Sequence, residues 1–405
     1  MMSFLMLRRR KANNTVEEHF NFHLATNLTH GIGCSRKIGD FLPEKAFRTI
    51  HLMVDEGVEA HSRYHEEIRN LLEKKSRKIF CQVLRGSEEP DYDYLDEVAG
   101  RARNLGDLDL LIGVGGGSCL DTAKAVAVLV TNGGKGIEYR GFDKVMNPGV
   151  PTLLIPSTAG TGSEATINAV FIDKHEKKKL GINGRYMSAT YAMLDAEWTL
   201  SCPKAVAVSS GMDALTHTLE SFMCKKANPL TRFYSREAFR LLYHALPCLV
   251  EDPGNKEKRQ DLLRGSYLAG IALYNSGSGI SGALSYPIGV HYKVPHGMAG
   301  AVFLATVVEY NVERGYRDYA ELYDLIEPGS ALPCEEKNRR FSHLLSELSG
   351  KIEVPQYLDR WGITKDNIEE VAQLMLPLQA AFDQNPVPFS ADADAKAMLK
   401  KHVQH

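Results

Sequence analysis

Two side chains that can hold a cation are spaced one helical turn apart in the second half of the chain. Asp213 and His217 are four residues apart in the segment GMDALTH, so on a helix their carboxylate and imidazole lie on one face. Both donor types bind divalent metals such as zinc. A third candidate, His296, stands between Pro295 and Gly297. A helix-face ion pair and a buried structural histidine fit the same residues, so the pattern alone leaves two interpretations open.

A glycine run in the first half has the composition of a phosphate-binding turn. Gly115, Gly116 and Gly117 follow the apolar segment 108–114 directly and precede Ser118 and a helical stretch. Glycines let backbone N–H groups approach a ligand closely, and the start of a helix attracts an anion. The triplet differs from the spaced G-x-G-x-x-G fingerprint, and a tight turn without a ligand is the alternative. The position between a strand and a helix favours phosphate binding.

Two further features stand at the ends of expected strands. The segment PSTAGTGSE at 156–164 supplies small hydroxyl side chains that can bond phosphate or ribose without filling a pocket. Asp55 ends the apolar segment 49–54, where its carboxylate could accept a hydrogen bond from an adenosine ribose and would repel a 2′-phosphate. An ordinary turn aspartate is the alternative for Asp55.

Alternating apolar segments and helical stretches must position these residues. Parallel strands joined by crossover helices form a sheet that binds ligands at the carboxyl ends of its strands. After Pro203 the apolar residues recur every three or four residues, which indicates helices. We expect an α/β domain with a parallel sheet over residues 1–203 and an all-α domain over residues 204–405, with the ligand site between them. Strands are expected at 49–54, 78–83, 108–114, 151–155 and 192–194, and helices at 66–74, 91–104 and 120–131.

The composition argues against several other classes of protein. The 48 Lys and Arg against 50 Asp and Glu leave a formal net charge of −2, so no basic excess exists for a nucleic-acid partner. No segment approaches the roughly 20 apolar residues that span a membrane. The seven cysteines are odd in number and contain no C-x-x-C pair, which is typical of buried thiols in a reducing compartment. We therefore expect a cytoplasmic protein.

Four motifs, in this order, resemble the iron-containing, metal-dependent alcohol dehydrogenase family. The resemblance runs from about Ile32 to the C-terminus and implies a dinucleotide-binding α/β domain followed by a helical domain. It also implies NAD-dependent hydride transfer between a primary alcohol and an aldehyde. Segments 131–141 and 179–183 are similar to a branch that oxidises sugar-acid alcohols, so a polar alcohol is one expected substrate. The motifs are GGGSCLDTAKA at 115–125, PSTAGTGSEAT at 156–166, GMDALTHTLES at 211–221 and ALSYPIGVHYKVPHG at 283–297.

The resemblance assigns a role to individual residues. Asp213, His217 and His296 match three of the four family ligands for a divalent metal, iron or zinc. His296 and Tyr286 would lie at the reacting groups, since some members carry a proton-transferring histidine where Tyr286 stands. Asp55 would favour NAD over NADP. The residues expected to contact NAD are Asp55, Gly115, Gly116, Gly117, Ser118, Asp121, Thr158, Thr161 and Lys179.

The fourth ligand position departs from the family. It is a histidine fourteen residues before the histidine of the PHG motif, and here it is Gly282. Water or substrate could complete a three-ligand site, or a neighbour such as His291 could replace the missing ligand. Otherwise the chain would be a metal-independent reductase or a non-catalytic dinucleotide-binding protein. By resemblance we expect a small-molecule alcohol or aldehyde as substrate and a homodimer or larger homo-oligomer.

Overall fold

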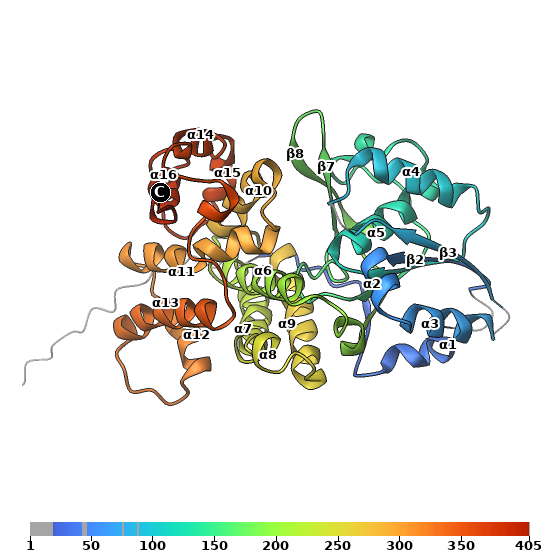
Figure 1. Cartoon of the computed structure of the whole chain (residues 1–405), viewed down its shortest axis with the longest axis horizontal. Coiled ribbons are helices and arrows are strands. Elements are labelled where there is room, and N and C mark those ends of the chain that lie inside the picture. The colour runs from blue at the N-terminus through green and yellow to red at the C-terminus, as the bar shows by residue number, and fades with distance from the viewer. Residues whose placement is uncertain (1–18, 43–46, 75–76, 87–88, 405) are drawn as a thin grey trace, which may run out of the picture.

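The chain folds into an α/β part and a helical part that lie side by side (Figure 1). The computed structural model describes residues 19–42, 47–74, 77–86 and 89–404. The α/β part holds a six-stranded sheet in the order β1-β9-β6-β4-β2-β3, and every neighbouring pair is parallel. The fold class expected from the sequence is therefore confirmed. The strands are β1 (Asn27–His30), β2 (Thr49–Asp55), β3 (Lys78–Leu84), β4 (Leu110–Gly115), β6 (Thr152–Pro156) and β9 (Tyr191–Leu194).

Helices cover both faces of this sheet, which is why its central strands are apolar throughout. Every residue of β4 and β6 is buried. Alternate strand residues face opposite sides, as Leu111 packs in the core beneath α4 and α5 while Leu110 and Ile112 pack in the core beneath α3. The helices of this part are α1 (Ile38–Phe41), α2 (Glu56–His61), α3 (Tyr64–Glu73), α4 (Tyr92–Arg103) and α5 (Gly117–Asn132).

The adjacent strands β2, β4 and β6 bring the expected cofactor residues to one edge. In the register of the sheet Val54 pairs with Val114, and Gly115 pairs with Pro156. Asp55, the glycine run and the 156–164 segment therefore begin at neighbouring strand ends. Helix α5 begins at Gly117 rather than at the expected residue 120, because Gly116 acts as its N-cap.

A second, three-stranded sheet was not expected from the sequence. Its order is β5-β8-β7, with β7 and β8 paired antiparallel. The turn between them, residues 174–177, lies within the charged segment DKHEKKK at 173–179, and Lys177 takes a left-handed φ of 51°. These charged residues interrupt the apolar pattern by which strands are recognised, so β7 and β8 were not predicted. No local sequence pattern specifies that the two strands pair. The strands are β5 (Gly141–Phe142), β7 (Asn168–Asp173) and β8 (Lys178–Asn183).

The described residues of the second half form helices joined by loops and include no strand, as expected. The long helix α6 is buried along most of its length, and α7, α9 and α11 pack around it. The boundary at residue 203 stays a prediction, with β9 ending at Leu194 and α6 beginning at Lys204. The helices are α6 (Lys204–Met223), α7 (Pro229–Ala245), α8 (Cys248–Glu251), α9 (Lys256–Tyr274), α10 (Ile280–Tyr292), α11 (His296–Glu313), α12 (Tyr319–Ile326), α13 (Cys334–Lys351), α14 (Ile368–Gln373), α15 (Gln379–Phe382) and α16 (Ala393–Lys401). Short 3-10 turns occupy Cys34–Lys37, Gly136–Tyr139, Arg185–Met187, Ala196–Thr199, Asp359–Trp361 and Leu376–Leu378.

Two sequence expectations concern the surface of the molecule. Among the described helices, none combines the length and the apolar character needed to cross a bilayer. All seven cysteines are unpaired. Cys81 and Cys334 are exposed, however, so the expectation of buried thiols is wrong for these two. Cys81 lies in β3 at the edge of the sheet, where alternate residues face solvent.

Candidate metal and cofactor site

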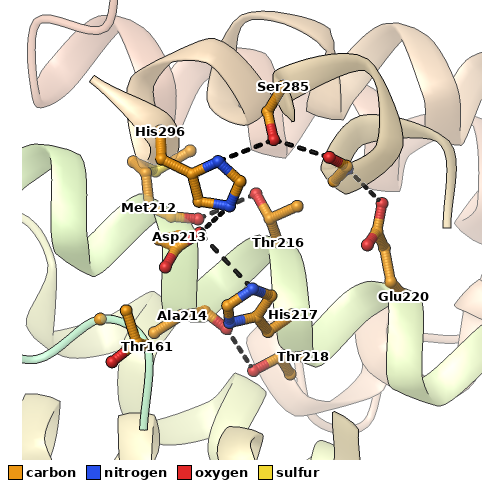
Figure 2. Close-up of polar contacts among 12 residues, drawn as sticks. Thr161, Met212, Asp213, Ala214, Thr216, His217, Thr218, Glu220, Ser285 and His296 are labelled. Carbon is orange, nitrogen blue, oxygen red and sulfur yellow. Dashed lines mark hydrogen bonds and ion pairs between the residues drawn. The ribbon is translucent and has the colours of Figure 1, made fainter. Parts of the chain in front are cut away.

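Asp213, His217 and His296 converge where the start of α11 meets the middle of α6 (Figure 2). One donor atom from each residue lies within 4.8 Å of the other two. Asp213 Oδ1 is 3.5 Å from His217 Nε2 and 3.8 Å from His296 Nε2. Around a tetrahedral ion with bonds of about 2.1 Å, neighbouring donors lie about 3.4 Å apart. The three side chains thus fit a divalent cation with only small adjustments.

A glycine allows the start of α11 to approach α6 this closely. A Cβ atom at Gly297 would lie 2.0 Å from the carbonyl oxygen of Ser209 and 2.8 Å from Asp213 Cβ. No other residue fits there without separating the two helices. The glycine of the PHG motif therefore has a positioning role, since it sets His296 above Asp213.

Ser285 orients the ring of His296. Its hydroxyl donates to the carbonyl oxygen of Gly282 at 2.6 Å, and Oγ lies 3.0 Å from His296 Nδ1. Because the single hydroxyl hydrogen is used, Nδ1 must carry the proton in this bond and Nε2 keeps its lone pair toward Asp213. Sequence reasoning missed Ser285, although it stands inside the fourth motif.

Burial and neighbouring charges prepare these groups for a cation. Burial lowers the pKa of His296 well below its usual value, and the positive charge of Lys179 lowers it further, so the imidazole is neutral at pH 7. Burial raises the pKa of Asp213, while His217 and Lys179 oppose that shift. A bound cation would favour the charged carboxylate, and a neutral imidazole is the form that binds metal.

The structure brings together the expected cofactor residues at the ends of β2, β4 and β6. A Cβ at Gly115 would lie 2.7 Å from Asp55 Cβ, and one at Gly117 would lie 2.6 Å from Thr161 Cγ2. At Gly116 the nearest atoms belong to Thr158, at 3.5 Å. Ser118, the second residue of α5, is half-buried beside them. The glycine run thus forms a narrow turn against both flanking loops.

The loop that carries Thr161 also touches the helical part. A Cβ at Gly160 would lie 2.7 Å from Ser210 Cβ on α6, and one at Gly162, where φ is 60°, would lie 2.7 Å from the carbonyl oxygen of Ser266 on α9. Ser210 precedes Asp213 by three residues, about one turn of α6, so the loop contacts the helix close to the three-residue cluster. The predicted cofactor loop and the three-residue cluster therefore belong to one site.

Asp121 supports this loop from within the protein. Its Oδ1 accepts from Ser163 Oγ at 2.5 Å and its Oδ2 from the Val170 amide at 2.9 Å. Both oxygens have protein partners, which gives Asp121 a positioning role, and its contact with NAD stays a prediction. Lys124 stands one turn further along α5, and its buried ammonium donates to the carbonyl oxygens of Ser163, at 2.8 Å, and Asn168.

Lys179 and Tyr286 lie near each other beside the metal ligands. Lys179 extends from β8, where Nζ is 2.6 Å from Glu89 Oε1 and 5.8 Å from the centre of the Tyr286 ring. Burial lowers the pKa of Lys179, but Glu89 and Tyr286 outweigh this effect and the net shift is upward. The Tyr286 ring lies 5.1 Å from that of His296. Burial raises the pKa of Tyr286, so its hydroxyl is protonated at pH 7.

Asp55 has the turn role considered for it. Its Oδ1 caps α2 by accepting from the amides of Gly57, at 2.9 Å, and Val58, at 3.4 Å. This is the ordinary turn role, and it fixes the carboxylate at the strand end beside the glycine run. The contact with a ribose stays a prediction.

At the fourth ligand position the structure offers no replacement from α10. The side chain of His291 is exposed near the end of the helix, and it does not belong to the group of donor atoms found among the described residues. The hypothesis that His291 replaces the missing ligand is therefore not supported. Gly282 is buried at the start of α10, against the carboxylate of Glu220.

Comparison with known proteins identifies the family to which the chain is similar. Residues 25–196 match the family model described as iron-containing alcohol dehydrogenase, and residues 207–403 match the model of the C-terminal part of the same family. Long-chain-alcohol dehydrogenase 1 of Geobacillus thermodenitrificans is 32% identical over 77% of this chain and 79% of its own length. Lactaldehyde reductase of Escherichia coli is 32% identical over 71% of this chain and 75% of its own. A solved 1,3-propanediol oxidoreductase superposes with a TM-score of 0.87 at 25% identity, covering 95% of this chain and all of that one.

The chain belongs to the iron-containing alcohol dehydrogenase family, as its four motifs indicated. It is an oxidoreductase that interconverts alcohols and aldehydes. The α/β part corresponds to the first family model and the helical part to the second.

Proposed function

We propose that this chain is an NAD-dependent, metal-assisted dehydrogenase of a small polar alcohol, or the reductase of its aldehyde. The observation that carries the proposal is the convergence of Asp213, His217 and His296, about one turn of α6 from the contact between Ser210 and Gly160 of the cofactor loop. An NAD-dependent methanol dehydrogenase of Bacillus methanolicus, 32% identical over 65% of this chain and 70% of its own length, supports the cofactor. When bound, iron or zinc would supply a Lewis acid that withdraws charge from the substrate oxygen.

The chain's own residues supply binding, orientation and proton control. The glycine turn and the first amides of α5 offer N–H groups to the pyrophosphate of NAD. Thr161 lies against Gly117 of that turn, and its neighbour Gly160 contacts Ser210, one turn before Asp213 on α6. The nicotinamide end would therefore lie next to the metal ligands. Tyr286, protonated at pH 7 and packed beside His296, is placed to exchange a proton through its hydroxyl oxygen or to form the wall of the pocket.

We further propose a homodimer or a larger homo-oligomer. Strand β1 supports it, since β1 is the edge of the six-stranded sheet and pairs only with β9 among the described strands. An unpaired strand edge favours association with another copy of the chain.

The metal content of the purified protein, measured together with NAD binding before and after chelation, tests the proposal. We expect about one equivalent of iron or zinc per chain, and chelation should remove both metal and turnover. NAD binding should survive chelation, because the glycine turn does not depend on the ligands. A chain that turns over an alcohol or aldehyde with no bound metal, after growth with added iron and zinc, would instead be a metal-independent reductase. NAD binding with no turnover of any alcohol would indicate the non-catalytic alternative.

Replacing Asp55 by asparagine tests the expected preference for NAD. The amide oxygen still caps α2, so the temperature of unfolding should change little. Loss of the negative charge removes repulsion of a 2′-phosphate, and we expect the ratio of kcat/KM for NADP to that for NAD to rise about tenfold or more. Steady-state kinetics with both cofactors measures this ratio. An unchanged ratio would leave Asp55 with the capping role alone.

A further inference from the structure

The residues that precede β1 contact both parts of the molecule. Residues 19–26, the N-terminal segment, form no helix or strand and lead into β1 at the edge of the six-stranded sheet. Phe22, His23 and Thr26 are half-buried, whereas the other five residues are exposed. The first residues of a domain stay poorly ordered unless specific contacts hold them, so the partners of these three residues indicate what the segment does.

On the side of the helical part, Asn275 binds the backbone of the segment. Asn275 is the C-cap of α9, and its Oδ1 accepts from the amide of His23 at 2.7 Å. Its Nδ2 donates to the carbonyl oxygen of His23 at 3.0 Å and to that of Ile271, in the last turn of α9, at 2.9 Å. The side-chain amide thus pairs with His23 as a residue of a neighbouring strand would. Phe22 stacks on Tyr234 of α7, with ring centres 5.7 Å apart.

On the side of the α/β part, two side chains of the same segment form hydrogen bonds. His23 Nε2 lies 3.2 Å from Ser188 Oγ, shortly before β9. The Thr26 hydroxyl donates to the carbonyl oxygen of Glu164 at 3.3 Å. Glu164 belongs to the cofactor loop, residues 156–166. The segment therefore joins α9 to the loop that is expected to contact NAD.

A small apolar core lies where these elements meet. Phe22 of the segment and Ala159 of the cofactor loop both pack against it. The core is distinct from the larger ones under the sheet and within the helical part. Its buried residues come from the loop, β9 and α9, and they are Ala165, Ala192, Leu194, Leu263, Tyr267 and Ile271. The segment thus adds both polar and apolar contacts to the joint between the two parts.

We propose that the N-terminal segment is a tie that fixes the cofactor loop against the helical part, with Asn275 as the positioning residue. The inference rests on the proposed function, because it assumes that the loop contacts NAD. The expected metal ligands belong to the helical part and the loop belongs to the α/β part, so hydride transfer needs a fixed relation between the two. The tie holds that relation from outside the site, since Phe22, His23, Thr26 and Asn275 are neither expected ligands nor expected cofactor contacts.

Hydrogen–deuterium exchange of the cofactor-free, full-length protein tests whether the tie holds the loop. Asn275→Ala removes both bonds to His23, and we expect the amides of residues 156–166 to exchange about tenfold faster or more. Asn255→Ala is the matched control, because Asn255 caps the other end of α9 and its side chain bonds only to Asp252 and Lys258 nearby in the chain. It should weaken α9 to a similar extent and leave exchange in the loop unchanged.

Titration with NAD tests whether the tie positions the cofactor. We expect Asn275→Ala to lower the affinity for NAD about tenfold and Thr26→Val, which removes the hydroxyl and keeps the shape, about threefold. Thr29→Val makes the same change in β1, outside the segment, and should bind NAD as the wild type does. In steady-state kinetics KM for NAD should rise more than kcat falls, because bound NAD itself holds the loop.

Each contrary result has a distinct meaning. Unchanged exchange of residues 156–166 in Asn275→Ala would overturn the tie, and equal effects of Asn275→Ala and Asn255→Ala would reduce Asn275 to a helix cap. Faster exchange with an unchanged affinity for NAD would overturn the positioning role. If Asn275→Ala does not fold, Thr26→Val against Thr29→Val gives the same comparison from the side of the segment. A wild type that binds no NAD would overturn the proposed function, while the exchange result would still decide whether the segment holds the loop.

Discussion

Asp213→Asn is expected to lower the affinity for iron or zinc more than 100-fold and kcat/KM by about 10³-fold. Asp213 is the central donor, because its Oδ1 faces both imidazoles, and it carries the only negative charge among the three expected ligands. Changes to groups that merely support a ligand reduce metal affinity 10- to 100-fold, so loss of the charged ligand should exceed that range. A Lewis acid contributes several kcal/mol to the transition state, and about 4 kcal/mol corresponds to a factor of 10³.

Metal analysis and steady-state kinetics of the same preparations measure both effects. NAD binding should stay within twofold of the wild type, because the glycine turn belongs to α5 and is independent of the carboxylate. Asp366→Asn, an exposed acid in the helical part, is the matched control and should leave metal content and turnover unchanged. Full turnover of Asp213→Asn without metal would favour the metal-independent reductase.

The metal cluster could be predicted in part because its spacing is local. Asp213 and His217 are neighbours on any helix, so residue type and spacing suffice to pair them. His296 is 79 residues beyond His217 and joins them only through the packing of α11 on α6, which no periodicity encodes. For His296 the resemblance to a family supplied what the pattern could not.

The supporting residues show where sequence reasoning stops. Ser285 lies on α10 and orients His296, which belongs to α11. Lys179 reaches the site from the hairpin of β7 and β8, whose strands were not predicted because the turn between them is charged.

The apolar strands were predicted well because burial on both sides makes them short continuous runs. The expected strands at 49–54, 78–83, 108–114, 151–155 and 192–194 each overlap a strand of the main sheet. Strand β1, at the edge of the sheet, has mostly exposed residues and lacks such a run. The sequence therefore predicted those strands whose burial on both faces produces a continuous apolar run.

Lys124→Met is expected to destabilise the fold by about 3–5 kcal/mol and to weaken NAD binding at least tenfold. The ammonium is fully buried, and it binds the carbonyl oxygens of Ser163 and Asn168 and lies 3.3 Å from Asp121 Oδ1. Methionine fills a similar volume but leaves those oxygens and one carboxylate without their positive partner, and removing one member of a buried pair costs about that much. Burial lowers the pKa of Lys124, and the negative charge of Asp121 opposes this shift.

Denaturant unfolding and NAD titration measure the two effects, with Lys365→Met as the exposed control. The loss of NAD affinity should exceed the loss of metal affinity, because Lys124 supports the loop with Thr158 and Thr161 and touches none of the three ligands. Equal losses would mean that the whole interface between the two parts has loosened. Unchanged NAD affinity with the expected loss of stability would show that contacts to α6 and α9 hold the loop, because Gly160 and Gly162 bring it against both helices.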